Sequence, residues 1–122
     1  MTSAERGPIE ILRQYWTHLE NDEFEAAADQ FSEDVAYLHP PAIEGVTEVH
    51  GRDDLLVFFR DTRGSREIHH TVERQVVDGA NAGIVGVATG RDVDGVHVYI
   101  CYLETEDDHI TYYSTCNRDL VI

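Results

Sequence analysis

The chain has 122 residues, which suffices for one domain with a hydrophobic core but is too short for two. Its 24 acidic residues outnumber 9 basic ones, for a formal net charge of −15. This balance argues against nucleic-acid binding, which needs a basic surface. The sequence contains neither an apolar run of about 18 residues nor a secretory signal pattern, so we expect no membrane span and a cytoplasmic location.

The acidity has two interpretations. It could form a docking surface for a basic partner, or it could be a solvated surface suited to high salt, where screening removes the self-repulsion of like charges. The carboxylates are spread along the chain and all nine cations are arginine, which favours the second interpretation. The composition resembles that of haloarchaeal cytoplasmic proteins, and we expect a halophilic protein whose resistance to denaturation falls as salt is withdrawn.

The first predicted helix spans Pro8–Glu20, where apolar residues recur at helical spacing and Pro8 suits the first turn. A D-x-x-E capping box at Asp22 and Glu25 predicts a second helix. That helix would carry four inward residues, namely Phe24, Ala27, Ala28 and Phe31. A short strand then ends at His39, before Pro40-Pro41, and is followed by a loop over residues 42–51 and a third helix over residues 53–62.

Four strands are predicted after the helices, near residues 67–77, 82–93, 96–105 and 109–121. They are separated by Asp78-Gly79, Asp94-Gly95 and Asp107-Asp108, which are turn signals. Helices followed by an antiparallel meander indicate an α+β fold in which the helices cover one face of the sheet.

Two-residue turns at Asp94-Gly95 and Asp107-Asp108 would define the two faces of this sheet, unless a one-residue slip exchanges them. One face, expected to line the interior, would carry Val85, Val87, Thr89, Arg91, Val98, Ile100, Tyr102, Tyr113, Thr115 and Asn117. The other would carry Tyr99, Cys101, Leu103, Tyr112, Ser114 and Cys116. In this register Cys101 and Cys116 are diagonal neighbours, too far apart for an easy disulfide, so we expect two free, packed thiols. No CxxC pair or zinc-like His/Cys spacing occurs, so neither a metal site nor a cofactor is expected.

The order of these elements resembles the NTF2-like superfamily, and more narrowly its SnoaL-like and ketosteroid-isomerase-like branch. The resemblance covers residues 8–119 and is carried by Tyr15, Phe24-Glu25-Ala26-Ala27, Phe31-Ser32-Glu33-Asp34-Val35, Gly51-Arg52-Asp53 and the closing hairpin 102–110. It implies a single domain over residues 1–122, with residues 1–7 flexible. The implied fold is a cone-shaped barrel in which three N-terminal helices pack on a strongly bent, mostly antiparallel sheet around one apolar pocket.

The resemblance also implies a site. Ketosteroid isomerases use an aspartate at the strand end before the proline as a proton-shuttling base, with a first-helix tyrosine and a protonated aspartic acid as oxyanion donors. His39 stands at the position of the base and Tyr15 matches the tyrosine. Ile100 stands at or near the second donor and cannot donate a hydrogen bond, which argues against steroid isomerisation by the usual mechanism.

The candidate catalytic residues are therefore His39 and Tyr15. The candidate substrate-binding residues are Trp16, Ile100, Tyr102, Tyr113, Thr115 and Asn117. Each has an alternative interpretation: His39 could be structural, and Tyr15 and Trp16 could be core residues. Relatives that catalyse dehydration also use a second histidine, for which His69, His70 and His97 are candidates, although strand alternation lets only one of the adjacent pair face inward.

Two function classes remain open. The first is a cofactor-independent proton-transfer enzyme, of isomerase, cyclase or dehydratase type, that acts on a small apolar molecule in the pocket. The second is a non-catalytic module that binds a ligand or dimerises. A homodimer through the sheet is expected in either case, with Tyr99, Cys101, Leu103 and Tyr112 at its interface.

Overall fold

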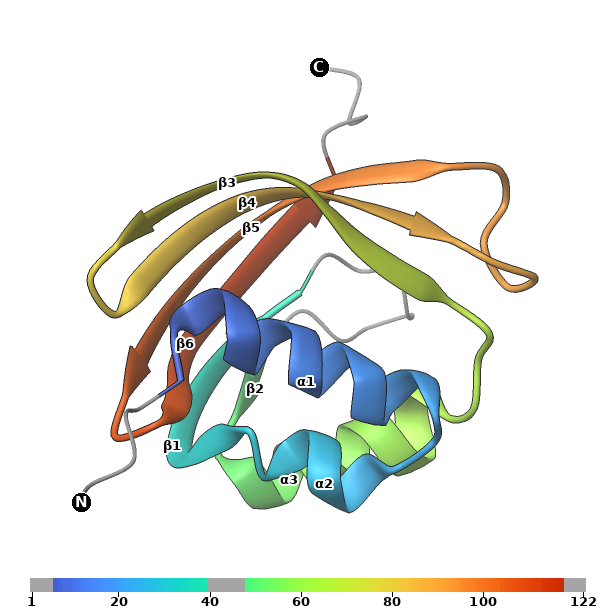
Figure 1. Ribbon diagram of the computed structural model, residues 1–122. Coiled ribbons are helices and arrows are strands. Elements are labelled where there is room, and N and C mark those ends of the chain that lie inside the picture. Colours follow the sequence, from blue (N-terminus) through green and yellow to red (C-terminus); the bar gives the residue numbers. More distant parts are fainter. Residues whose placement is uncertain (1–5, 40–47, 118–122) are drawn as a thin grey trace.

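A computed structural model describes residues 6–39 and 48–117, which form three helical segments on one side of a curved six-stranded sheet (Figure 1). The elements are α1 (Pro8–Glu20), α2 (Phe24–Ala28), β1 (Phe31–Leu38), β2 (Glu48–His50), α3 (Arg52–Val57) with the π-helix η1 (Phe58–Arg63), β3 (His69–Asp78), β4 (Asn81–Thr89), β5 (His97–Glu106) and β6 (His109–Asn117). The strand order is β2-β1-β6-β5-β4-β3, and β1 and β6 are parallel whereas the other neighbours are antiparallel. The predicted α+β architecture is confirmed.

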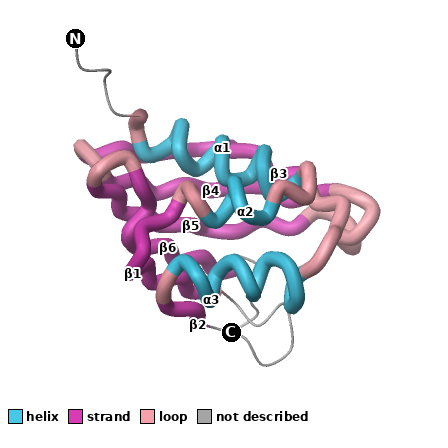
Figure 2. Tube along the Cα trace, turned by 90° about the horizontal axis from the view of Figure 1, so that it is seen from below, coloured by secondary structure: helices cyan, strands magenta, loops and turns pink. Residues whose placement is uncertain are grey.

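The hydrophobic core lies between the helices and the concave face of the sheet. Helix α1 lies toward β3 and β4, while α3 lies toward β1 and β2 (Figure 2). The buried side chains of α1 recur every three or four residues, at Pro8, Ile11, Leu12, Tyr15, Trp16 and Leu19. Among the described residues, no helix is long and apolar enough to cross a membrane.

The second helix is shorter than predicted, and it starts without the expected capping box. Glu23 is its N-cap and makes no side-chain capping hydrogen bond. Asp22 instead adopts a left-handed conformation, with φ at 59°, and its carboxylate accepts a 2.7 Å hydrogen bond from Ser65. Phe31, placed on this helix by the prediction, is the first residue of β1. The short strand β2 lies wholly within the segment predicted as a loop.

The hairpin between β4 and β5 does not have the predicted two-residue turn. Strand β4 ends at Thr89, because Gly90 has a φ of 137° and a Cβ there would lie 2.4 Å from the carbonyl oxygen of Glu67. The connection therefore runs from residue 90 to residue 96, and Val85 pairs with Ile100. The register differs from the prediction by an even number of residues, so Val85 and Ile100 share a face as expected.

The hairpin between β5 and β6 has the predicted turn but an unpredicted bulge. Asp107 and Asp108 have φ values of 50° and 64°, as a tight two-residue hairpin turn requires. Thr105 pairs with Ile110, yet the preceding residue Glu104 pairs with Tyr112, so Thr111 is an extra residue in β6. Beyond this bulge every residue of β6 is displaced by one position, which moves its side chains to the other face.

The bulge and the burial pattern overturn part of the predicted face assignment. Ile100 and Tyr102 lie on the outer face of the sheet, 44% and 41% exposed, so the prediction that they line the interior is wrong. Tyr99, Cys101 and Leu103 are buried against the helices. They cannot form the predicted dimer interface, because their side chains are already packed inside the domain.

The two cysteines are free, as predicted, but for a different reason. The residues of β5 and β6 pair as Cys101 with Thr115 and Ile100 with Cys116, which places the two thiols on opposite faces of the sheet. Cys101 is buried, and burial raises the pKa of its thiol to about 12. Cys116 is exposed, so the expectation that both thiols are packed is wrong for this residue.

The N-terminal segment is anchored at its first described residue. The backbone N–H of Arg6 donates to the Asp108 carboxylate at 2.9 Å, and the Arg6 guanidinium contacts the same carboxylate at 3.1 Å. Residues 1–5 lie outside the described part of the chain, and the flexibility expected for residues 1–7 stays a prediction.

Gly86 on β4 provides a test of the packing inside the sheet. A Cβ at this position would lie 2.5 Å from the Tyr99 ring, so Gly86→Ala must displace that ring. We expect Gly86→Ala to lower the free energy of unfolding by about 1–3 kcal/mol in chemical denaturation. Gly83→Ala on the same strand is the control, since its Cβ would meet nothing within 4 Å. Equal stability of the two variants would contradict this packing.

Candidate active site

A line of three stacked rings runs along the parallel strands β1 and β6. Tyr37 and Tyr113 are register partners, and their ring centroids are 4.7 Å apart with an interplanar angle of 5°. His39 comes two residues after Tyr37 and therefore faces the same side of the sheet. Its ring stacks on Tyr37 at 5.9 Å and meets the edge of Phe58 at 6.0 Å. The predicted strand-end histidine thus continues a buried tyrosine stack, and it is itself half-buried.

Helix α1 adds a second phenol to this stack. The hydroxyl of Tyr15 lies 2.9 Å from the hydroxyl of Tyr37, and the Tyr15 ring is held between Phe31 and Phe59 at centroid distances of 4.8 and 5.6 Å. Burial raises the pKa of both phenols above the ordinary value, although the positive charge of Arg63 partly opposes this. The pair therefore stays protonated at neutral pH and can donate a hydrogen bond.

A second aromatic group joins α1, β3 and β5. His70 stacks on Trp16 at 5.1 Å, and Tyr99 meets these two rings edge-on at 6.1 and 6.2 Å respectively. Trp16 Nε1, His70 Nδ1 and the Tyr99 hydroxyl are all buried without a hydrogen-bond partner. Buried polar atoms are nearly always paired with protein or ordered water, so three orphaned atoms on touching rings indicate a place for a ligand or water.

Glu20, at the end of α1, supplies a carboxylate beside His70. Its oxygens lie 3.2 Å from Nδ1 of His69 and 3.8 Å from Nδ1 of His70, and the second distance is too long for a hydrogen bond. Burial favours the neutral acid, but His70 and His69 outweigh it and hold the pKa of Glu20 below its usual range. Glu20 borders a hollow of about 390 Å³ lined by Arg13, Trp16, Thr17, Glu20, His70, Thr71 and Val72.

Only one of the three candidate second histidines faces the interior. The His70 side chain is 17% exposed, whereas the adjacent His69 is 59% exposed, as strand alternation requires. His97, at the start of β5, is also exposed.

Arg63, the last residue of η1, places a guanidinium in the same interior. Its Nη1 donates to the carbonyl oxygen of Gly64 at 2.9 Å, while Nη2 is buried and has no partner. Within residues 6–39 and 48–117, no cluster of three or more histidine, cysteine or acidic side chains could hold a metal ion.

The structure brings together only some of the residues selected from the sequence. Tyr15, Trp16 and Tyr113 are buried in the interior, so the first two are core residues, and their role in a pocket stays a prediction. Thr115 is half-buried, and the side chain of Asn117 lies outside the described part of the chain. Ile100 and Tyr102 lie outside the interior.

The sequence analysis missed several polar residues of the interior, namely Glu20, Tyr37, Arg63 and Tyr99. Tyr37 could have been found, because it precedes His39 by two residues in a strand. Glu20 follows Trp16 by four residues in a helix, which also places it on the same side. Nothing in the local pattern distinguishes Arg63 from the neighbouring surface arginines, and Tyr99 was assigned to the wrong face.

The hydrogen bond between the Tyr15 and Tyr37 hydroxyls predicts a measurable coupling between the effects of the two substitutions on the free energy of unfolding. Tyr15→Phe or Tyr37→Phe alone leaves the other hydroxyl buried without this partner, so each should lower the free energy of unfolding by about 1–3 kcal/mol. The double variant should lose less than the sum of the single losses, by about 0.5 kcal/mol or more, in a denaturation cycle. Tyr112→Phe, half-buried on the outer face, is the control. Additive losses would show that the two hydroxyls do not interact.

Comparison with known proteins supports a family assignment. Residues 12–113 match the profile of the SnoaL-like domain. A protein assigned as a ketosteroid isomerase from Kribbella flavida superposes with a TM-score of 0.71 and 24% identity, over 93% of this chain and 78% of the other. An LEH-like epoxide hydrolase from M. tuberculosis superposes with a TM-score of 0.69 and 16% identity, over 90% and 81%.

A third similar structure is a protein with a ketosteroid isomerase-like fold from Catenulispora acidiphila, solved in complex with trimethylamine. Its TM-score is 0.73 at 18% identity, over 91% of this chain and 86% of the other. No curated protein matched the chain. The structural likenesses establish a shared fold, and the profile covers most of the sequence: the chain belongs to the SnoaL-like domain family, within the NTF2-like superfamily.

Proposed function

We propose that the protein is a proton-transfer enzyme, of isomerase, cyclase or dehydratase type, that acts on a small and largely apolar molecule. The observation that carries this proposal is the hydrogen-bonded Tyr15–Tyr37 pair in one aromatic stack with His39. Neutral phenols that donate hydrogen bonds and a histidine that can titrate near pH 7 are the groups needed to form and quench an enolate. Related folds include proteins assigned as a ketosteroid isomerase and a polyketide cyclase.

In this proposal His39 removes and returns the proton. The Tyr15–Tyr37 pair donates a hydrogen bond to the oxygen on which negative charge develops, as a preorganised donor in an interior site does. The Tyr99 hydroxyl supports a second donor role, because it is buried and unpartnered. Tyr99 directly precedes Ile100, the residue that the family resemblance had suggested for that donor. Because side chains alternate along β5, Tyr99 points into the interior and Ile100 points away from it.

His70 and Glu20 support a second acid–base role. A histidine beside a carboxylate can deliver a proton to a leaving group. Dehydration needs such a group in addition to the base that abstracts a proton. The pair therefore favours dehydration or isomerisation with two proton transfers over a single-base reaction.

The enzymatic role can be tested without knowing the natural substrate. The protein is incubated in D2O with a panel of small alicyclic and aromatic ketones, and deuterium incorporation at the carbon next to the carbonyl is followed by NMR. We expect catalysed exchange with at least one ketone and a loss of about 100-fold or more in His39→Gln, because the proton acceptor is removed. His50→Gln is the control, since His50 is exposed on β2. Equal exchange rates of His39→Gln and the unmodified protein would refute the proposed role of His39.

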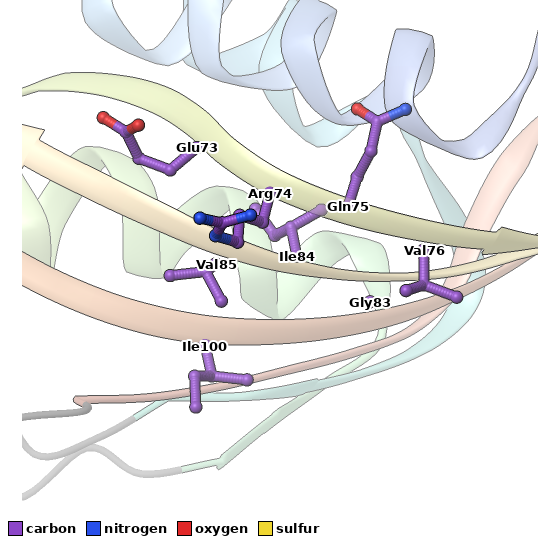
Figure 3. Close-up of a pocket in the computed structure, with 8 residues that line it drawn as sticks. All are labelled: Glu73, Arg74, Gln75, Val76, Gly83, Ile84, Val85 and Ile100. Atoms are coloured by element: carbon purple, nitrogen blue, oxygen red, sulfur yellow. The ribbon is translucent and has the colours of Figure 1, made fainter.

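We also propose a homodimer, formed through the outer face of the sheet. An outer patch is defined as Val76, Val85, Ile100 and Tyr102. The first three of these residues line a hollow of about 500 Å³ on β3, β4 and β5 (Figure 3). Exposed apolar side chains grouped on a sheet face favour association in a chain that is otherwise rich in charge. A two-fold axis through this face would let the same patch on each copy cover the other.

Sedimentation tests the dimer. The unmodified protein should sediment at twice the chain mass of 13.8 kDa, and Ile100→Glu should sediment as a monomer, because it places a charge in the interface. Val57→Glu is the matched control, since Val57 is equally exposed but lies on α3. A single 13.8 kDa species of the unmodified protein in multimolar salt would contradict the proposal.

A further inference from the structure

Arg63 differs from the paired arginines of the described chain in lacking an acidic partner. Arg6, Arg60 and Arg91 each contact a carboxylate. Arg63 has no carboxylate within 4 Å among residues 6–39 and 48–117, and one of its guanidinium nitrogens, Nη2, is buried with nothing to donate to. Other arginines of the described residues also lack an ion pair, but among those residues Arg63 is the one arginine with a guanidinium nitrogen that is buried and has no hydrogen-bond partner.

The local backbone holds this guanidinium in place. Arg63 ends η1, and Gly64 follows with a φ of 65°, which turns the chain toward β3. Nη1 donates to the Gly64 carbonyl at 2.9 Å, and the carbonyl of Arg63 accepts from Arg66 Nε at 3.1 Å. One edge of the guanidinium is thereby used by the turn, while the nitrogen at Nη2 is left for another acceptor.

The charge of Arg63 acts on the tyrosine pair of the site. It lowers the pKa of the buried phenols Tyr15 and Tyr37, against the larger effect of burial, so the guanidinium lies close enough to be felt there. Arginine stays protonated in proteins, and a buried nitrogen of a charged group without an acceptor is unfavourable. An anion at Nη2 would remove this penalty.

We propose that the interior site binds a small cyclic carboxylate, an aromatic or alicyclic carboxylic acid in its ionised form, with the carboxylate on Nη2 of Arg63. This inference rests on the proposed function of the same site and adds the class of its substrate. A single free nitrogen suits a monoanion, whereas a phosphate dianion would need more donors and would meet stronger repulsion from a chain of net charge −15. Trp16 and His70, which line the hollow of about 390 Å³, provide aromatic surfaces for the cyclic part of the ligand.

Trp16 provides a reporter for the test. It is the only tryptophan of the chain, and its Nε1 is buried and unpartnered among the rings of His70 and Tyr99. The indole N–H therefore gives one resolved ¹H–¹⁵N signal from inside the site. Benzoate and cyclohexanecarboxylate are titrated against this signal, and the neutral amides benzamide and cyclohexanecarboxamide are titrated in parallel at the same salt concentration.

We expect saturable shifts with the carboxylates and at least tenfold weaker binding of the matching amides. Arg63→Met should weaken carboxylate binding at least tenfold and make acid and amide bind alike. Arg60→Met is the matched control, because Arg60 lies on the same π-helix, is exposed and pairs with Asp61. Arg63→Lys keeps the charge and should retain part of the preference, which covers the case in which Arg63→Met does not fold.

Three results would overturn the inference: amides that bind as tightly as the acids, a preference unchanged in both Arg63 variants, or an indole signal that none of the compounds shifts. The test is separate from that of the enzymatic role. Carboxylate binding that depends on Arg63, together with absent deuterium exchange, would leave the ligand class in place and refute only proton transfer. Deuterium exchange that depends on His39, together with equally tight binding of acids and amides, would leave proton transfer in place and refute only the ligand class.

Discussion

Successive side chains of a strand point to opposite faces of the sheet. In this protein one inserted residue in β6 decides which of that strand's side chains face the interior. Thr111 forms a bulge in β6, so the residues beyond it exchange faces relative to a regular hairpin. Tyr113 consequently meets Tyr37 on β1 and completes the ring stack that leads to His39. Without the extra residue, Tyr113 would project from the outer face and Tyr15 would lose one of its ring neighbours.

The interior combines dense aromatic packing with polar atoms that the protein does not pair. A purely structural core avoids such groups, because each buried and unsatisfied donor or acceptor costs about 1–3 kcal/mol. Here Trp16, Arg63, His70 and Tyr99 each contribute one, from four different elements of the fold. Such a concentration is typical of a place that a ligand or ordered water occupies.

Much of the fold could be read from the sequence, because its signals are local. Pro8 and helical spacing mark α1, and the Asp-Asp pair between alternating residues marks the last turn correctly. The errors came from non-local effects. Gly90 stops β4 because its backbone crosses that of Glu67, and a bulge at Thr111 has no signal in the residue type. The bulge exchanges the faces of β6, whereas the longer β4–β5 connection shifts the register by an even number of residues and leaves the shared faces of β4 and β5 unchanged.

The site was predicted only in part, for the same reasons. His39, Tyr15 and Trp16 lie in elements whose orientation follows from one turn or one strand end, and they occupy the interior edge or the core as proposed. Ile100 and Tyr102 depended on a face assignment that was wrong. Helical spacing places Glu20 on the same side as Trp16 but does not reveal its contacts with His69 and His70, and no spacing along the chain distinguishes Arg63.

The parallel contact between β1 and β6 also constrains how the chain is made. Tyr37 and Tyr113 are roughly 75 residues apart, a separation that slows the closure of such contacts. During synthesis, β1 and both leading helices leave the ribosome long before the strand that covers their aromatic rings exists. Phe31, Tyr37 and Trp16 must remain uncovered for that interval, and dense negative charge along the nascent chain opposes its association with other copies. Repulsion between like-charged nascent chains thus acts before the core that covers these rings has formed.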